Sequence, residues 1–239
     1  MRLFFLVVPT LFMTTVVFSD SSQYINNRIS TGKIIIDGQE MGDSSHVIKG
    51  SGVRAKIDRK AKQFSSVNVE GVFDVIYSHG SPSIKITGDD NIIKFVLSSV
   101  TNNSLKLGIN KSYSNFYPII INVSSDNIQE ITFEGAGALK LDDIKTDQLT
   151  LKILGSVDVL ATGEATSLNL DIRGVGDIKA RGLDSEIVNI DLVSASDVEV
   201  TAHTKLQANI TGVGDILYFG SPEEVSKQIS GVGDIEAGE

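Results

Sequence analysis

The pentapeptide Gly174-Val175-Gly176-Asp177-Ile178 decides how this chain folds, because close copies of it recur at a nearly constant spacing. Identical copies occupy residues 212–216 and 231–235, and degenerate copies begin at Gly135, Gly155 and Ser194. The six copies thus start at positions 135, 155, 174, 194, 212 and 231, and a seventh, separate copy occupies residues 71–75. A fixed period near twenty residues predicts a stack of similar structural units.

Apolar and polar residues alternate in the segment that leads into each copy. Before Gly174, for example, Leu168, Leu170 and Ile172 alternate with polar neighbours. Period two with one apolar face predicts a half-buried strand. A second short strand follows each copy, and then a turn-rich stretch such as residues 181–185. Because one such unit cannot bury its apolar face alone, the pattern predicts a parallel β-helix, a solenoid, over residues 128–239.

The five motif positions carry different constraints. The first is Gly in six of seven copies, which predicts an unusual backbone conformation or a close approach of two backbones. The third admits Phe73 and Val157 as well as Gly, so we expect it to point into the core and not to require a positive φ. The fifth is always Val, Leu or Ile and is therefore expected to be buried.

The fourth motif position is Asp in six of seven copies, namely Asp74, Asp158, Asp177, Asp197, Asp215 and Asp234. These carboxylates should face outward in a row. Neighbours about 4.8 Å apart would repel by roughly 3.5 kcal/mol at an effective dielectric of 20. We expect water and backbone amides at the bend to relieve this repulsion, with no bound metal, because calcium-binding β-roll repeats are shorter than these.

The chain begins with the features of an exported protein. Residues 1–19 combine Arg2 with an apolar stretch and predict a signal peptide cleaved after Ser19, with no membrane insertion afterwards. Residues 20–63 are expected to form a flexible leader that is basic toward its end. We therefore expect a periplasmic, cell-surface or secreted location.

Composition excludes several function classes. The net charge of −9 and the lack of a basic stripe argue against nucleic-acid binding. The chain has no Cys, and its three His residues lack the spacing of metal ligands. We therefore predict no catalytic residue, metal or cofactor. The alternative is a carbohydrate-active β-helix enzyme with Asp171, Arg173, Lys179 and Arg181 on one face, but the uniformly short connections favour binding.

Residues 64–127 are expected to form a less regular β-rich region. It should contain a short helix at residues 92–97, capped by residues 89–91, and a turn at Asn102-Asn103 between two strands. The loop at residues 111–117 carries Tyr113, Phe116 and Tyr117. These aromatic residues either bind a ligand or cap the first coil and cover its strand edge.

Residues from 64 to the C-terminus resemble the head GIN domain family, which is described as auto-transporter adhesins. The resemblance rests on residues 64–69 with 73–75, on 90–93, on 104–107, on the Gly-x-Gly copies and on 206–222; Ser194-Ala195-Ser196 departs from it. It implies an exported bacterial protein whose β-helix is right-handed.

Together these features predict an exported, non-catalytic, adhesin-like binding protein that presents a rigid surface to a glycan or protein ligand. Besides the enzyme, the other alternative is a structural, self-assembling envelope protein. Since the final copy has only four residues after it, we also expect the open coil ends to pair with other copies of the chain.

Overall fold

The computed structural model describes residues 35–36, 39–40, 47–193 and 195–239. The chain divides into two units, Met1–Ser44 and Ser45–Glu239. In the first, β1 (Ile35–Ile36) pairs antiparallel with β2 (Gln39–Glu40). The predicted signal peptide and the first part of the predicted leader lie outside the described residues, apart from these two strands. In the part of the chain that is described, no helix is long and apolar enough to cross a membrane.

The first part of the unit Ser45–Glu239 consists of short strands and a four-residue helix, α1 (Asp90–Ile93). The strands are β3 (Ile48–Lys49), β4 (Arg54–Lys60), β5 (Ser66–His79), β6 (Ser83–Asp89), β7 (Val96–Thr101), β8 (Ser104–Ile109), β9 (Tyr113–Ser114) and β10 (Ile120–Ser125). The predicted helix at residues 92–97 is therefore wrong at its C-terminal end, because Val96 already begins β7. The predicted turn is confirmed: Asn102 and Asn103 join β7 to β8, both with positive φ, as a two-residue hairpin requires.

The second part of this unit is built from strands that pair in parallel. They are β11 (Glu130–Ile172), β12 (Ile178–Leu192), β13 (Val198–Ile210), β14 (Ile216–Phe219), β15 (Glu224–Ile229) and β16 (Ile235–Ala237). Leu168 lies beside Val188, which lies beside Leu206, which lies beside Val225. Each neighbour in this row is separated from the next by one period of the sequence motif.

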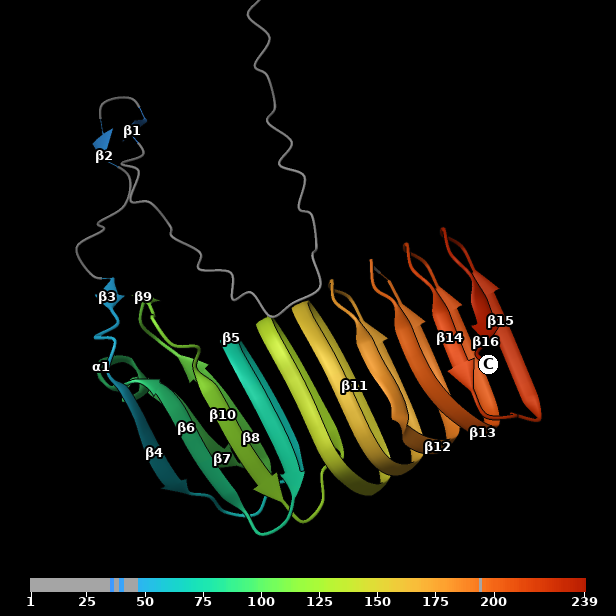
Figure 1. Cartoon of the computed structure of the whole chain (residues 1–239), viewed down its shortest axis with the longest axis horizontal. Helices are drawn as coiled ribbons and strands as arrows, with labels where there is room; N and C mark the ends of the chain where they lie inside the picture. Colours follow the sequence, from blue (N-terminus) through green and yellow to red (C-terminus); the bar gives the residue numbers. More distant parts are fainter. Residues whose placement is uncertain (1–34, 37–38, 41–46, 194) are drawn as a thin grey trace, which may run out of the picture. The chain divides into compact units, whose positions relative to one another are not determined.

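The strands follow one open path through a mixed sheet, in the order β16-β14-β13-β12-β11-β5-β10-β6-β4. Figure 1 shows this path from β4 in blue to β16 in red. β6 pairs antiparallel with both β4 and β10, and β7 pairs antiparallel with β8. The all-β class is confirmed. The sheet is neither closed nor uniformly parallel. β10 lies between β5 and β6, parallel to the first and antiparallel to the second, and among the described strands of this sheet only the two-residue turn after β7 joins neighbouring antiparallel strands.

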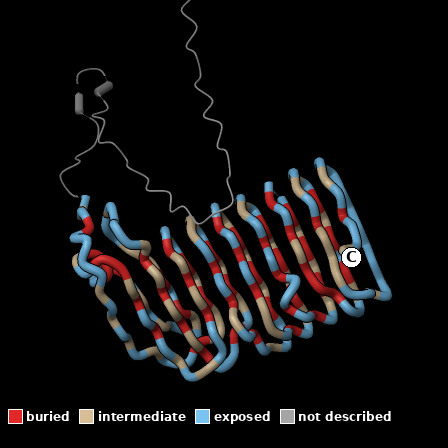
Figure 2. The backbone as a smooth tube through the Cα atoms, in the orientation of Figure 1, coloured by how far each residue is buried: buried red, intermediate tan, exposed pale blue. Residues whose placement is uncertain are grey.

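Alternating residues of the strands form one continuous hydrophobic core. In Figure 2, buried residues alternate with intermediate or exposed ones along most strands, whereas β4 and β15 have no buried residue. The fifth motif position is buried in all seven copies, as predicted, with exposed fractions of 5% or less. These residues are Val75, Leu139, Val159, Ile178, Val198, Ile216 and Ile235.

The motif glycines allow neighbouring backbones to approach each other closely. A Cβ atom on Gly174 would lie 1.9 Å from the carbonyl oxygen of Gly155, and one on Gly155 would lie 2.0 Å from that of Gly135. The predicted close approach at the first position is confirmed. The expectation for the third position is wrong where that residue is Gly: Gly137, Gly176, Gly214 and Gly233 have φ of 136–146°. Only the larger residues, such as Phe73 and Val157, turn inward and are buried there.

Candidate functional site

The aromatic loop at residues 111–117 lies beside the segment that precedes β4. β9 pairs in parallel with β3, with Tyr113 beside Ile48. Two backbone hydrogen bonds hold the pair, from Ile48 N–H to Ser112 O (2.9 Å) and from Gly50 N–H to Ser114 O (2.7 Å). The loop is therefore partly a strand that is attached to residues 48–50.

Tyr113 is a structural anchor of this loop. Its ring is half-buried against the hydrophobic core, and its hydroxyl group donates a hydrogen bond to the carbonyl oxygen of Val72, at 3.1 Å. Burial raises the pKa of the Tyr113 hydroxyl group. These contacts fit the capping role considered for this residue.

Phe116 and Tyr117 instead reach the surface. The side chain of Phe116 is 71% exposed and that of Tyr117 is 36% exposed. The Arg54 guanidinium lies 5.9 Å from the centre of the Tyr117 ring, and Val53 beside it is 58% exposed. The Phe116 ring lies next to Gly52, within 3.9 Å of where a Cβ atom would be. We call Val53, Arg54, Phe116 and Tyr117 the aromatic patch.

Asp89 fixes the backbone beneath the aromatic patch. This carboxylate is fully buried and accepts hydrogen bonds from the backbone amides of Gly52 (2.8 Å), Phe116 (2.9 Å) and Tyr117 (3.1 Å). Sequence reasoning assigned Asp89 only a capping role at the helix, but its side chain makes no hydrogen bond to the helix. The consecutive acids at 89–90 indicate a polar feature, but not that one of them is buried under a distant loop.

The neighbouring side chains complete this junction. Asn91 donates from Nδ2 to Lys49 O (2.7 Å) and accepts at Oδ1 from Ser51 N–H (3.0 Å). The hydroxyl group of Ser51 donates to Asp90. Residues 49–53 are therefore tied both to α1 and to the aromatic loop.

The outward row of Asp residues has a structural role. Asp158 Oδ1 accepts the backbone N–H of Asp177 (3.1 Å), Asp197 that of Asp215 (3.0 Å), and Asp215 that of Asp234 (2.9 Å). Asp74 likewise accepts the N–H of Ala138, while burial raises the pKa of its carboxyl group. The predicted relief of repulsion by backbone amides at the bend is confirmed at these four carboxylates.

Every one of these amides follows a positive-φ glycine. Gly137, Gly176, Gly214 and Gly233 immediately precede the four donors. The left-handed conformation of the glycine directs the next N–H toward the carboxylate of the preceding motif copy. The third and fourth motif positions therefore act as a pair.

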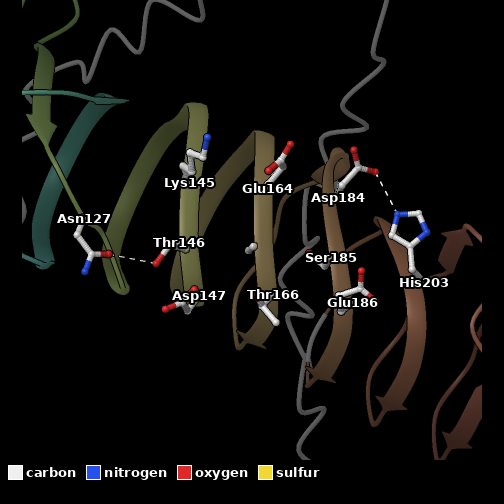
Figure 3. A pocket seen from close by; sticks show the side chains of 11 residues that line it. Asn127, Lys145, Thr146, Asp147, Glu164, Thr166, Asp184, Ser185, Glu186 and His203 are labelled. Carbon is white, nitrogen blue, oxygen red and sulfur yellow. Dashed lines mark hydrogen bonds and ion pairs between the residues drawn. The ribbon is translucent and has the colours of Figure 1, made fainter.

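A shallow groove of about 740 Å³ crosses the segments that lie between successive motif copies (Figure 3). One wall carries Lys145, Glu164, Asp184 and His203, and the other carries Asp147, Thr166 and Glu186. His203 Nε2 lies 3.4 Å from Asp184 Oδ1, and the Thr204 hydroxyl group donates to Glu186. Among the described residues, no Phe or Tyr side chain lines the groove, and most of the side chains that line it are polar.

The side chains of the four residues considered for a carbohydrate-active enzyme do not converge on one point. These residues are Asp171, Arg173, Lys179 and Arg181. Arg173 forms ion pairs with Asp171 (2.8 Å, without hydrogen-bond alignment) and Asp191 (3.5 Å). Lys179 lies 3.8 Å from Asp177, and the Arg181 guanidinium stacks 3.7 Å from the centre of the Phe219 ring. Within the described residues, no group of three or more His, Asp or Glu side chains could hold a metal ion. His46 lies outside the described residues.

Residues 63–222 match the family model described as "Putative auto-transporter adhesin, head GIN domain". The chain belongs to this family. No curated protein matches it.

Several solved structures share the fold. A "putative adhesin" from Bacteroides fragilis is 28% identical with a TM-score of 0.66, over 80% of this chain and 99% of that one. A "putative adhesin" from Parabacteroides distasonis is 19% identical with a TM-score of 0.55, over 80% and 99% of the two chains. A "putative lipid binding protein" from the same species is 21% identical with a TM-score of 0.52, over 79% and 99%.

Proposed function

We propose that this chain is an exported, non-catalytic, adhesin-like protein that binds a glycan or protein ligand through the aromatic patch. The observation that carries the proposal is the contrast at Phe116. Its side chain is 71% exposed, yet its backbone amide is held by the buried carboxylate of Asp89. A large apolar side chain presented to solvent on a fixed backbone has the properties of a contact anchor.

Three features support a binding role for the patch. Three backbone amides donate to the buried side chain of Asp89, so this one residue holds residues 52 and 116–117 in place. A preorganised loop loses less conformational entropy when a ligand binds. Aromatic and Arg side chains, both present here, are the residue types enriched at the centres of binding surfaces.

The family membership supports an adhesin-like role without naming the ligand. We also propose that the chain is exported to the periplasm, the cell surface or the medium after cleavage behind Ser19. In addition, we propose that residues 128–239 wind as a right-handed parallel β-helix. The parallel register, in which neighbours lie one motif period apart in the sequence, supports this winding.

The test is a binding screen of the protein on glycan and matrix-protein arrays. A ligand found with the unaltered protein is then titrated against the Phe116→Ala, Tyr117→Ala double variant. We expect at least a tenfold loss of affinity, as for the removal of a binding hot spot. Leu160→Ala is the matched control, because it removes a 44% exposed apolar side chain outside the patch. Unchanged affinity in the double variant with an unchanged melting temperature would rule out the patch as the ligand site.

A further inference from the structure

The two ends of the sheet in Ser45–Glu239 carry opposite charge. Residues 54–62, which contain β4, hold five basic residues and one acidic residue, for a net charge of +4. Residues 223–239, which contain β15 and β16, hold five acidic residues and one basic residue, for a net charge of −4. β4 is the first strand of the open path, and β15 and β16 are the last strands at its other end.

Both ends also have an unpaired strand edge. Within the described residues, β4 pairs only with β6, β15 only with β13, and β16 only with β14. Each of these edges therefore presents backbone N–H and C=O groups that could pair with another strand.

The hydrophobic core is exposed at the C-terminal end. Leu206 and Ile210 of β13 are 0% and 1% exposed, because motif copies cover them on both sides. Their neighbours in β15 occupy the same core positions, but Val225 is 42% exposed and Ile229 is 44% exposed. In Figure 2, β15 is exposed along its whole length.

Lys227 covers only the centre of this end. It lies beside Ala208 in the register of β13 and β15. Its ammonium group donates to Ile235 O (2.7 Å) and lies 4.7 Å from the centre of the Tyr218 ring. Val225 and Ile229, on either side of Lys227, stay open to solvent.

We propose that copies of this chain associate head to tail, with the acidic β15–β16 end of one copy docked on the basic β4 edge of the next. The occupant is a second copy because the chain itself carries both complementary surfaces. Contact between two acidic ends would place like charges together, and so would contact between two basic ends. A head-to-tail contact is heterologous, so it builds chains or rings of copies and not two-fold symmetric dimers.

This inference goes beyond the proposed ligand binding and does not depend on it. Arg54 belongs both to the aromatic patch and to the basic segment, whereas Phe116 and Tyr117 lie outside the two charged segments. In an assembly, each copy would contribute one patch, and several weak contacts with a surface would then act together.

The test measures the mass of the protein by light scattering over a range of concentrations and at low and high salt. We expect the mass to rise with concentration at low salt and less so at high salt, because salt screens charges. Two triple variants then reverse the charge of one end each, using exposed residues only. The acidic end is changed by Glu223→Lys, Asp234→Lys, Glu236→Lys, and the basic end by Lys56→Glu, Lys60→Glu, Lys62→Glu.

Each triple variant carries two ends of like sign, because three reversals outweigh the net charge of the altered end. The affinity between copies of each variant should therefore fall at least about tenfold. An equal mixture of the two variants brings opposite charges together at each contact again and should recover association.

The matched control makes the same charge change away from the ends, through Glu134→Lys, Asp147→Lys, Glu164→Lys, and should associate like the unaltered protein. The proposal is overturned by a monomer at every concentration, or by an assembly that both end variants retain. Two further measurements separate this outcome from that of the proposed function. They are ligand binding by the two end variants and self-association of the Phe116→Ala, Tyr117→Ala variant.

Discussion

Glycine at the first and third motif positions serves two different needs. At the first position the requirement is steric, because a Cβ atom would overlap the backbone of the preceding copy, even where φ is not positive, as at Gly174. At the third position the glycine also has positive φ and turns the next amide toward an Asp carboxylate. Phe73 and Val157 fill the third position in copies where the side chain turns inward instead.

Gly174→Ala should destabilise the protein. The new Cβ atom would lie 1.9 Å from Gly155 O, so the two backbones must move apart. We expect a loss of roughly 1–3 kcal/mol in the free energy of unfolding, measured by chemical denaturation. Gly108→Ala is the matched control in another strand, because the nearest atom, Glu70 O, is 3.6 Å away. That variant should be unchanged or more stable by up to about 1 kcal/mol; similar losses in both variants would contradict the steric account.

For single residues, the sequence predicted burial better than backbone conformation. The fifth position and the outward Asp residues followed from the alternation of apolar and polar residues alone. The positive φ of Gly176 did not, because the same column also holds Phe73 and Val157, and one residue's φ depends on how its neighbour stacks. Asp89 was missed for a similar reason: its three amide donors come from segments that are distant in the sequence.

The row of Asp residues joins successive motif copies, and so acts between whole strands. Where a positive-φ glycine interrupts the regular ladder, the carboxylate of the preceding copy accepts the redirected amide. Asp215 takes part twice, since its own N–H donates to Asp197 and its Oδ1 accepts from Asp234. The row therefore connects four pairs of successive copies through hydrogen bonds from a backbone amide to a carboxylate.

Asp215→Ala should weaken this junction, whereas Asp215→Asn should preserve most of it. Alanine removes the acceptor of the Asp234 amide, which costs about 0.5–1.5 kcal/mol, toward the lower end because water reaches this exposed site. Asparagine keeps an acceptor oxygen. Denaturation of the two variants measures the difference. Calcium should leave the melting temperature of the unaltered protein unchanged; a clear rise that is lost in Asp197→Asn, Asp215→Asn would show a metal site instead.

Element boundaries were predicted less well than element types. The sequence divides each repeat into two short strands and a turn, but β12 runs unbroken from Ile178 to Leu192 through residues 181–185. The chain bends there while most of its residues still pair with the neighbouring strands. The register with β13 shifts twice, between Ala180 and Asp184 and between Ser185 and Ile187. Local turn chemistry cannot reveal such pairing. Nor does it reveal that β9 attaches the aromatic loop to β3, because the two segments are far apart in the sequence.

Across the unit Ser45–Glu239, stability should depend on position in the stack. Each motif copy packs mainly against its two neighbours, so a core residue in the middle is covered from both sides. The last copy is covered from one side only, and its strand β15 is exposed throughout. The same column of side chains therefore offers a direct comparison between the middle and the end.

Val188→Ala and Val225→Ala make the same chemical change in one column, since Val188 and Val225 both neighbour Leu206. Val188 is 0% exposed, so its loss should cost about 2 kcal/mol or more through lost burial and the cavity left behind. Val225 is 42% exposed, so its loss should cost less than about 1 kcal/mol in dilute protein at high salt, where copies stay apart. At high concentration and low salt, the two variants should also differ in self-association. Val225→Ala should weaken association, because this side chain lies at the docking end, and Val188→Ala should not. Equal unfolding costs in dilute protein would mean that Val225 is already covered within a single copy, and the docking end would then lose its apolar component.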